Sequence, residues 1–243
     1  MFERVEEMGF GARAPGRRNR REWPEHNVAI DGRHQDRSST ASPVDATPHV
    51  FVLDHDHATR RSIAAMLRGS GCSIEGHASA SEFLARPCAT GPSCLILGMA
   101  RDQENLDLQK HLATERPDMP IIIVAGAIDV PTCAEAMKTG ALDFLLKPLD
   151  TDSFRDSVAN AIEHSRTAVR EAAELTDLHK RHASLSPREH QVMQLVVSGL
   201  PNKLISDRLG ISEITVKAHR GKVMHKMRAR SLANLTVIAM RLG

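Results

Sequence analysis

Four consecutive polar residues are the first in the chain whose types and spacing suggest chemistry. Asp54, His55, Asp56 and His57 directly follow the apolar run Val50–Leu53. Imidazole and carboxylate groups together can bind a transition metal, so a metal site is one interpretation of this cluster. Polar residues between a strand and a helix are more typical of turns and helix caps. We therefore expect no bound metal or other cofactor here and keep the metal site as an alternative.

Basic residues near the carboxyl terminus suggest a different chemistry. Residues 184–243 contain ten Lys and Arg against three Asp and Glu, a net charge of +7. Residues 48–147 carry −3 and residues 148–183 carry −2, so the whole chain has only +2. An acidic part joined to a basic part is the charge distribution expected of a nucleic-acid binder with a separate regulatory domain.

Nucleophilic chemistry has little support in the sequence. The cysteines, Cys72, Cys88, Cys94 and Cys133, form no CxxC pair, and the apolar neighbours of Cys94 and Cys133 favour inert buried thiols over a redox switch. No set of nucleophile, base and oxyanion donors is present, so we do not expect an enzyme. Unpaired cysteines and the lack of an apolar run of about 18 residues predict a soluble, cytoplasmic protein without membrane contact.

The elements that position these residues follow from composition and periodicity. A length of 243 residues, 41% of them hydrophobic and 26% charged, predicts about two folded domains. From residue 48 onward, short apolar runs alternate with helical patterns, which predicts a doubly wound α/β domain over residues 48–165. Its functional crevice should lie at the carboxyl ends of the strands. The predicted strands are Val50–Leu53, Cys94–Leu97, Ile121–Val124, Leu142–Leu146 and a shorter one near Cys72–Glu75.

Helical signals dominate the second half of the chain. Residues 166–183 predict a linker helix, and residues 184–243 predict an all-α domain of four helices. Its first helix has Ser186 as N-cap and Glu189 at the third position, which is a capping box. Residues 1–47, by contrast, are rich in Arg, Gly, Pro and Ser, have no net charge and show no apolar periodicity, so they predict a disordered arm.

The α/β domain and the carboxyl-terminal helical domain each resemble a known family. Leu185-Ser-Pro-Arg-Glu, Gly199-Leu-Pro-Asn-Lys, Leu209-Gly-Ile-Ser-Glu and Thr215-Val-Lys-Ala-His-Arg resemble the LuxR-type helix-turn-helix domain over nearly all of residues 184–243. The α/β domain resembles a flavodoxin-like receiver domain, and its pattern from Ala136 to Pro148 is similar to NarL/FixJ-type response regulators. Together these resemblances imply a transcription regulator of the two-component type that binds double-stranded DNA in the major groove.

The third helix of the carboxyl-terminal domain carries the predicted DNA contacts. On a helix that begins near Glu213, Val216, Val223 and Met227 share one face by their spacing and should face the core. The opposite face should meet the major groove. The residues on that outward face are Lys217, Ala218, Gly221 and Lys222.

The resemblance to the LuxR-type domain also implies a division of roles among these residues. It assigns base contacts to Lys217, Ala218 and Gly221, and phosphate or rim contacts to Thr215, Arg220 and Lys203. Gly221 is unexpected, because a glycine within a helix costs about 1 kcal/mol relative to Ala and offers no side chain to a base. Either the backbone approaches DNA closely there, or specificity at that position is weak.

The α/β domain departs from the receiver pattern where phosphorylation would occur. The resemblance to receiver domains implies that phosphorylation would need an Asp after the third strand, an acidic pair after the first, a hydroxyl after the fourth and a Lys after the fifth. A divalent cation and an ammonium are needed because they offset the phosphate charge. These positions hold Gly98, Asp54 with His55, Ala125 and Lys147. Glycine has no nucleophile, and imidazole is a poor Mg²⁺ ligand. We therefore predict a degenerate receiver that works without aspartyl phosphorylation.

The sequence thus predicts a sequence-specific DNA-binding transcription regulator with an atypical receiver. We expect a homodimer, with the receiver domain as one candidate interface, and keep another regulator as a second candidate partner. Two alternatives stay open. One is a conventionally phosphorylated response regulator, and Gly98 is the feature against it. The other is an interaction protein that pairs with an intact response regulator through its receiver surface.

Overall fold

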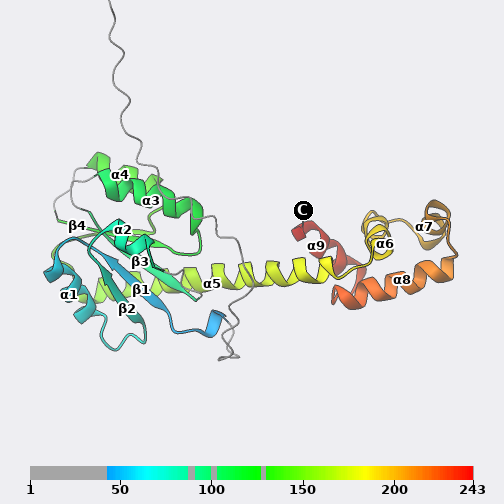
Figure 1. Cartoon of the computed structure of the whole chain (residues 1–243), viewed down its shortest axis with the longest axis horizontal. Coiled ribbons are helices and arrows are strands. Elements are labelled where there is room, and N and C mark those ends of the chain that lie inside the picture. Colours follow the sequence, from blue (N-terminus) through cyan, green and yellow to red (C-terminus); the bar gives the residue numbers. More distant parts are fainter. Residues whose placement is uncertain (1–42, 87–90, 100–102, 127–129, 243) are drawn as a thin grey trace, which may run out of the picture. The chain divides into compact units, whose positions relative to one another are not determined.

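The computed structural model describes residues 43–86, 91–99, 103–126 and 130–242 (Figure 1). Most of the predicted arm over residues 1–47 therefore lies outside the described residues. The described end of that arm contains a short 3-10 helix, η1 (Pro43–Asp45).

A five-stranded parallel sheet forms the centre of the first domain. Its strands are β1 (His49–Leu53), β2 (Ser73–His77), β3 (Ser93–Met99), β4 (Ile121–Ala125) and β5 (Asp143–Leu146), in the spatial order β2-β1-β3-β4-β5. The register places Leu53 beside Leu97 and Gly98 beside Val124, so the carboxyl ends of β1, β3 and β4 meet at one edge. The predicted doubly wound α/β fold is confirmed.

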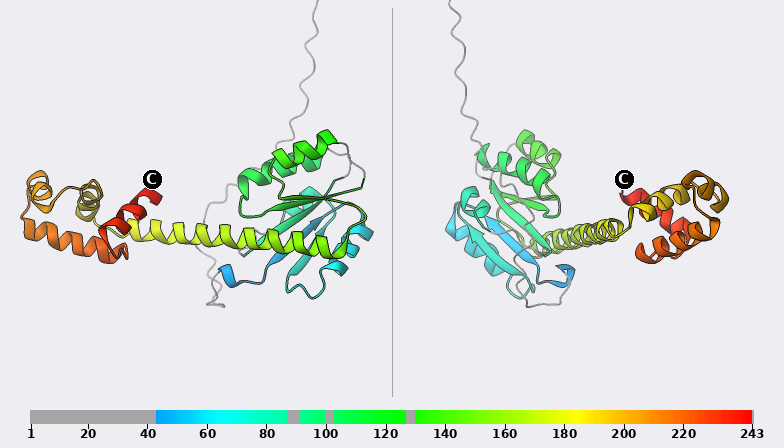
Figure 2. Two further views of the ribbon diagram at one scale, coloured as in Figure 1. Left: turned by 180° about the vertical axis from the view of Figure 1, so that it is seen from behind. Right: turned by 45° about the vertical axis from the view of Figure 1, so that its right-hand side comes forward.

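Helices cover both faces of the sheet. The helices α1 (His57–Met66) and α5 (Thr151–Ala183) lie on one face, and α2 (Ala80–Leu84), α3 (Gln103–Glu115) and α4 (Val130–Lys138) lie on the other (Figures 1 and 2). Because β3 and β4 are covered on both sides, they are continuous apolar runs rather than alternating ones. The core against α1 and α5 includes Val50, Val52, Ile96, Ile122, Val124, Ile63, Leu67, Phe154 and Val158.

Helix α5 includes both the end of the predicted α/β domain (residues 48–165) and the predicted linker helix (residues 166–183). It runs without a break through 33 residues, from the end of the α/β domain through the predicted linker. Asp150 caps its start by accepting a hydrogen bond from the Ser153 backbone N–H at 2.9 Å. No Gly or Pro interrupts the helix, so nothing in its sequence favours an end before Ala183. Its first part supplies Phe154 to the sheet core, and Leu178 near its end belongs to the core of the second domain.

Four further helices form the second domain. They are α6 (Pro187–Val197), α7 (Asn202–Leu209), α8 (Glu213–Lys226) and α9 (Leu232–Leu242). Gly210 ends α7 in the left-handed region, at φ 64°, which allows the tight turn into α8. The predicted all-α domain is confirmed. Its core consists of Leu178, Leu185, Val192, Met193, Val196, Ile205, Val216, Val223, Met227, Leu235 and Ile238.

An ion pair between the buried Glu189 and the half-buried Lys226 fixes the end of α8 against the start of α6. The Glu189 carboxylate accepts hydrogen bonds from the Ser186 backbone N–H at 2.8 Å, which completes the predicted capping box, and from Lys226 Nζ at 2.7 Å. Lys226 Nζ also donates to the Ser184 carbonyl at 2.9 Å. The hydrogen bonds from Lys226 and Ser186 hold the pKa of Glu189 below its ordinary value of 4.5.

Substitution Glu189→Gln tests this ion pair. The variant keeps the shape of the side chain but removes its charge, so the free energy of unfolding at neutral pH should fall by about 1–3 kcal/mol. A carboxylate with a lowered pKa stabilises the folded state fully above its unfolded pKa, and this contribution is lost as the pH falls through the folded pKa. Urea unfolding of the wild type should therefore show a loss of stability below about pH 4.5 that is smaller in the variant.

A matched control is Glu163→Gln, which breaks the exposed pair between Glu163 and Arg166 on α5. Exposed ion pairs contribute little, so this control should change the free energy of unfolding by at most about 1 kcal/mol. Equal effects of the two substitutions would show that the pair at Glu189 has no special structural role.

Candidate functional site

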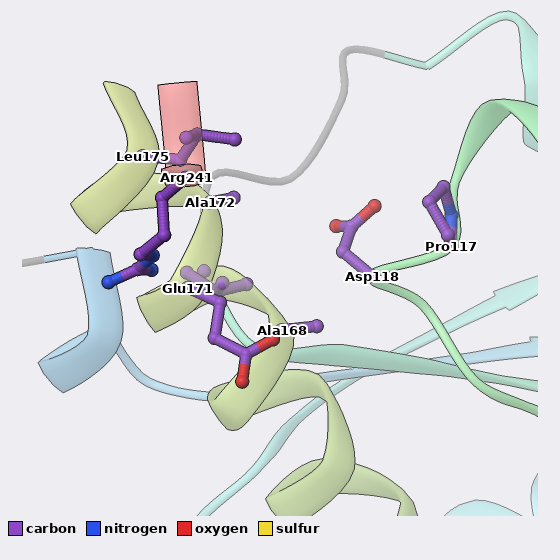
Figure 3. A pocket seen from close by; sticks show the side chains of 9 residues that line it. Pro117, Asp118, Ala168, Glu171, Ala172, Leu175 and Arg241 are labelled. Carbon is purple, nitrogen blue, oxygen red and sulfur yellow. The ribbon is translucent and has the colours of Figure 1, made fainter. Parts of the chain in front are cut away.

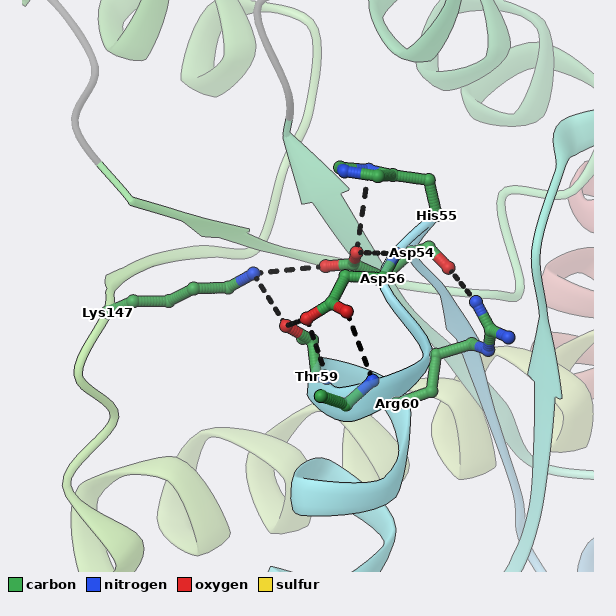
Figure 4. Close-up of polar contacts among 7 residues, drawn as sticks. Asp54, His55, Asp56, Thr59, Arg60 and Lys147 are labelled. Carbon is green, nitrogen blue, oxygen red and sulfur yellow. Dashed lines mark hydrogen bonds and ion pairs between the residues drawn. The ribbon is translucent and has the colours of Figure 1, made fainter.

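The first candidate site lies at the carboxyl end of β1. Asp54 follows this strand, and only 3% of its side chain is exposed (Figure 4). Its carboxylate accepts hydrogen bonds from Lys147 Nζ at 3.1 Å and from the Asp56 backbone N–H at 2.8 Å. A buried carboxylate needs such partners, because they offset the hydration free energy that it loses on burial.

Lys147, directly after β5, connects this carboxylate to the start of α1. Its Nζ also donates to Thr59 Oγ1 at 3.2 Å, and Thr59 Oγ1 donates to the Asp56 carboxylate at 2.7 Å. Hydrogen bonds from the side chain of Thr59 and from the backbone N–H groups of Thr59 and Ala58 lower the pKa of Asp56, the N-cap of α1. Sequence reasoning missed Thr59. Its place three residues after the N-cap Asp56 is the signal that could have indicated it.

Gly98 lies against Asp54, where β3 ends. A Cβ added at residue 98 would lie 2.6 Å from Asp54 Cγ and 3.0 Å from Asp54 Cβ, and it would overlap Oδ2. The glycine therefore allows the Asp54 carboxylate to lie against the backbone of β3. Any larger residue at this position would have to displace a buried, ion-paired side chain.

The two remaining predicted pocket residues border this group. The His55 side chain is 76% exposed, with Nδ1 at 3.6 Å from Asp54 Oδ1, and Ala125 is buried, with its carbonyl accepting a hydrogen bond from the Lys147 backbone N–H at 2.7 Å. The structure thus brings all five predicted pocket residues together. In the described part of the chain, His, Cys, Asp and Glu side chains form no group of three or more that could hold a metal ion.

The second candidate site is the exposed face of α8. Val216, Val223 and the adjoining Met227 are buried, as their spacing predicts, and the opposite face lies in solvent. Ser212 caps the helix by accepting a hydrogen bond from the Thr215 backbone N–H at 3.2 Å, and the hydroxyls of these two residues lie 2.8 Å apart. The exposed residues include the predicted Lys217, Ala218, Gly221 and Lys222.

Arg220 makes a contact that its residue type alone does not predict. Its Nη1 donates to Asn202 Oδ1 at 2.7 Å, so it joins α8 to the first residue of α7. Lys203, the next residue of α7, is exposed. The two helices of the helix-turn-helix are thus held together by a side-chain hydrogen bond beside an exposed cation.

Ile214 is a candidate contact that sequence reasoning missed. It lies in the first turn of α8 and is 83% exposed. Its spacing of three, four and seven residues from Lys217, Ala218 and Gly221 is the signal that could have indicated it, because these positions share one helix face.

A pocket also lies beside α5. Pro117 and Asp118 face the small side chains Ala168 and Ala172 there (Figure 3). Burial raises the pKa of Asp118, but hydrogen bonds and charge from Arg116, at 2.9 and 3.0 Å, lower it further than burial raises it. This carboxylate is therefore already paired within its own loop.

The Cys94 thiol is chemically inert. The residue is fully buried in β3, and burial, with a smaller effect of Cys72, raises the pKa of its thiol to about 12. The nucleophile of cysteine chemistry is the thiolate, which is not populated at neutral pH with such a pKa.

Among the described helices, none combines the length and the apolar character required to cross a membrane. The fold and the two sites instead define a class of protein in which a receiver-like domain precedes a DNA-binding helix-turn-helix. Residues 50–159 match the response regulator receiver domain, and residues 183–239 match the luxR family of bacterial regulatory proteins.

Several known proteins are similar to this chain over most of their own length. Nodulation protein W of Bradyrhizobium diazoefficiens is 40% identical over 195 residues, which cover 80% of this chain and 86% of that protein. The transcriptional regulatory protein FixJ of the same organism is 37% identical over 196 residues, covering 80% of this chain and 96% of that protein. The solved structure of the response regulator StyR has a TM-score of 0.70 at 36% identity and covers 81% of this chain and 100% of that one.

This chain belongs to the NarL/FixJ-type response regulators with a LuxR-type DNA-binding domain. It is accordingly a transcriptional regulator, and its relatives are regulators rather than enzymes.

Substitution Gly98→Ala tests the close contact at the end of β3. The added methyl group must displace the Asp54 carboxylate from Lys147, so the free energy of unfolding should fall by about 1–3 kcal/mol in urea titrations. In an Asp54→Ala background the same substitution should cost much less, because the group that it would overlap is gone.

Gly126→Ala is the matched control, because Gly126 is exposed after β4 and an added Cβ there has no neighbour within 4 Å. It should lower stability by no more than about 0.5 kcal/mol. Costs at residue 98 that are the same with and without Asp54 would contradict the predicted overlap.

Proposed function

We propose that this protein is a DNA-binding transcription regulator whose receiver domain works without aspartyl phosphorylation. The observation that carries the proposal is the contact between Gly98 and Asp54. The residue at the end of β3 has no nucleophilic side chain, and the space beside it is filled by a carboxylate paired with Lys147. A receiver of this kind keeps its fold but has no group at this position to accept a phosphoryl group.

The charges of the pocket support the same conclusion. In phosphoryl transfer a fixed ammonium offsets the charge of the transferred group. Lys147 is already within hydrogen-bond distance of Asp54 and Thr59, so the pocket is balanced without phosphate. The residues also fit Mg²⁺ poorly, because His55 stands where a second carboxylate is needed and Asp54 is engaged by Lys147.

On the DNA side, we propose that α8 enters the major groove. Lys217, Ala218 and Gly221 are assigned to base edges. The positions assigned to phosphates or the rim of the site are Lys203, Thr215 and Arg220, and Lys222 lies on the outward face that would meet the groove. The protein would act in the cytoplasm as a homodimer on two half-sites, since a two-fold protein matches a two-fold operator.

The test of phosphorylation independence is DNA binding with and without a phosphodonor. Full-length protein purified without any donor should bind its operator with the same affinity after incubation with acetyl phosphate or beryllofluoride in Mg²⁺. Phosphate-affinity gels should show no shifted band. An intact response regulator with an aspartate after its third strand serves as the positive control in both assays.

Two outcomes would decide against the proposal. A tenfold gain in affinity with the donor, about 1.4 kcal/mol, would favour a conventionally phosphorylated regulator. A lack of DNA binding by the isolated protein, with binding recovered on addition of an intact regulator, would favour the interaction protein instead.

The assigned roles on the DNA side predict opposite behaviour for two exposed lysines. Lys217→Ala should relax the preference at one base pair by about 1–3 kcal/mol and affect random DNA little. Lys203→Ala should weaken binding to all sequences alike and reduce the slope of log affinity against log salt by about one. Binding titrations at several salt concentrations measure both quantities. Equal losses on specific and random DNA for both variants would contradict the assignment of Lys217.

A further inference from the structure

The strongest unexplained feature of the second domain is an exposed isoleucine. Ile214 is 83% exposed, more than any other large apolar side chain in the described residues. It is held in a regular, capped helical turn, because Ser212 accepts the hydrogen bond that starts α8. An isoleucine there leaves its apolar surface in water, and a ligand that covers it gains the free energy of burial.

Its position indicates the kind of ligand. Ile214 lies on the helix face of Lys217, Ala218 and Gly221, while Val216 is buried on the opposite face. The first turns of a recognition helix are the part that contacts base edges in the major groove. Ile214 is therefore placed where a base pair would lie when the other three residues face DNA.

The four residues Ile214, Lys217, Ala218 and Gly221 are mostly apolar, and Lys222 adds a second cation on the same outward face. Lys217 is the only one of the four residues with a hydrogen-bonding side chain, and a Cβ added at Gly221 would have no neighbour within 4 Å. The 5-methyl group of thymine is the apolar feature that a base pair presents in the major groove. The net charge of +7 on residues 184–243 favours a phosphate-rich ligand over an apolar protein surface.

We propose that Ile214 is a specificity-determining residue that recognises the 5-methyl group of a thymine in the operator, beside the base contacted by Lys217. This inference rests on the proposed placement of α8 in the major groove. It predicts an operator half-site in which at least one thymine is selected for its methyl group rather than for its hydrogen-bonding edge.

The experiment removes that methyl group without changing base pairing. The wild-type protein first selects its preferred site from a pool of random duplex DNA. Each thymine of this site is then replaced singly by deoxyuridine, which lacks the 5-methyl group. At one thymine per half-site the affinity of the wild type should fall about three- to fivefold, as expected for loss of one buried methyl group.

The variant Ile214→Ala completes a double-mutant cycle. It should bind the thymine site about as weakly as the wild type binds the deoxyuridine site, and it should no longer distinguish the two. The control Met240→Ala removes another exposed apolar side chain, on α9, and should keep the full preference for thymine. Lys217→Ala should also keep that preference while losing selectivity at its own base pair. Thermal unfolding should be unchanged in Ile214→Ala, because the side chain is exposed.

The outcomes separate this inference from the proposed function. An Ile214→Ala variant that still distinguishes thymine from deoxyuridine would overturn the role of Ile214. Failure of every deoxyuridine substitution to weaken wild-type binding would do the same, while leaving DNA binding by α8 intact. A wild-type protein that selects no sequence would overturn both proposals.

Discussion

The ion pair between Asp54 and Lys147 is the interaction on which the α/β domain depends at its functional edge. Its carboxylate is almost completely buried, so it requires a cation, and Lys147 supplies one from the end of a different strand. The same ammonium contacts Thr59, which fixes the start of α1. Gly98 leaves the room that this arrangement needs. The changes at His55 and Ala125 are consistent with it, because a pocket that balances its own charges needs neither a second metal ligand nor a hydroxyl for a phosphoryl group.

A second ion pair holds helices together in the helical domain and fixes the position of α8. Glu189 and Lys226 join the start of α6 to the end of α8, and the hydrogen bond between Arg220 and Asn202 joins α8 to α7. These contacts hold α8 from its inner side, where Val216 and Val223 are also buried. The side chains on the outer side of α8 are therefore available to contact another molecule. Recognition of base edges requires a rigid helix with an exposed face. If the helix were disordered in the free protein, the free energy of ordering it would reduce the affinity for DNA.

Local signals in the sequence predicted much of this structure. The apolar runs of β1, β3 and β4 are unambiguous because both faces of these strands are buried, and the capping box at Ser186 marks the start of α6. The close approach of Gly98 to Asp54 was not predictable in detail, since it depends on the register between strands distant in sequence. The contact of Thr59 with Lys147 and that of Arg220 with Asn202 have the same origin, because each joins segments that are separate in the sequence. The predicted boundary between the α/β domain and the linker helix falls within α5, which continues from Thr151 to Ala183 because no Gly or Pro intervenes.

In the proposed function, the receiver has no phosphoryl switch, and selectivity would depend on the face of α8 that we propose contacts DNA. Phosphate contacts contribute affinity for all sequences alike, so discrimination must come from the few side chains that meet base edges. The exposed stripe of α8 offers the cations Lys217 and Lys222, the aliphatic side chains of Ile214 and Ala218, and a glycine. A good bidentate contact is worth only about 1–3 kcal/mol and a buried methyl group about 0.8 kcal/mol, which is too little for one half-site to stand out among many competing sequences. A two-fold dimer doubles the contribution of each contact without any new residue, because both half-sites are read by the same stripe. The proposed contacts of α8 and the proposed homodimer are thus linked: the fewer hydrogen bonds α8 would make to bases, the more a regulator of this kind would depend on pairing two copies of that helix.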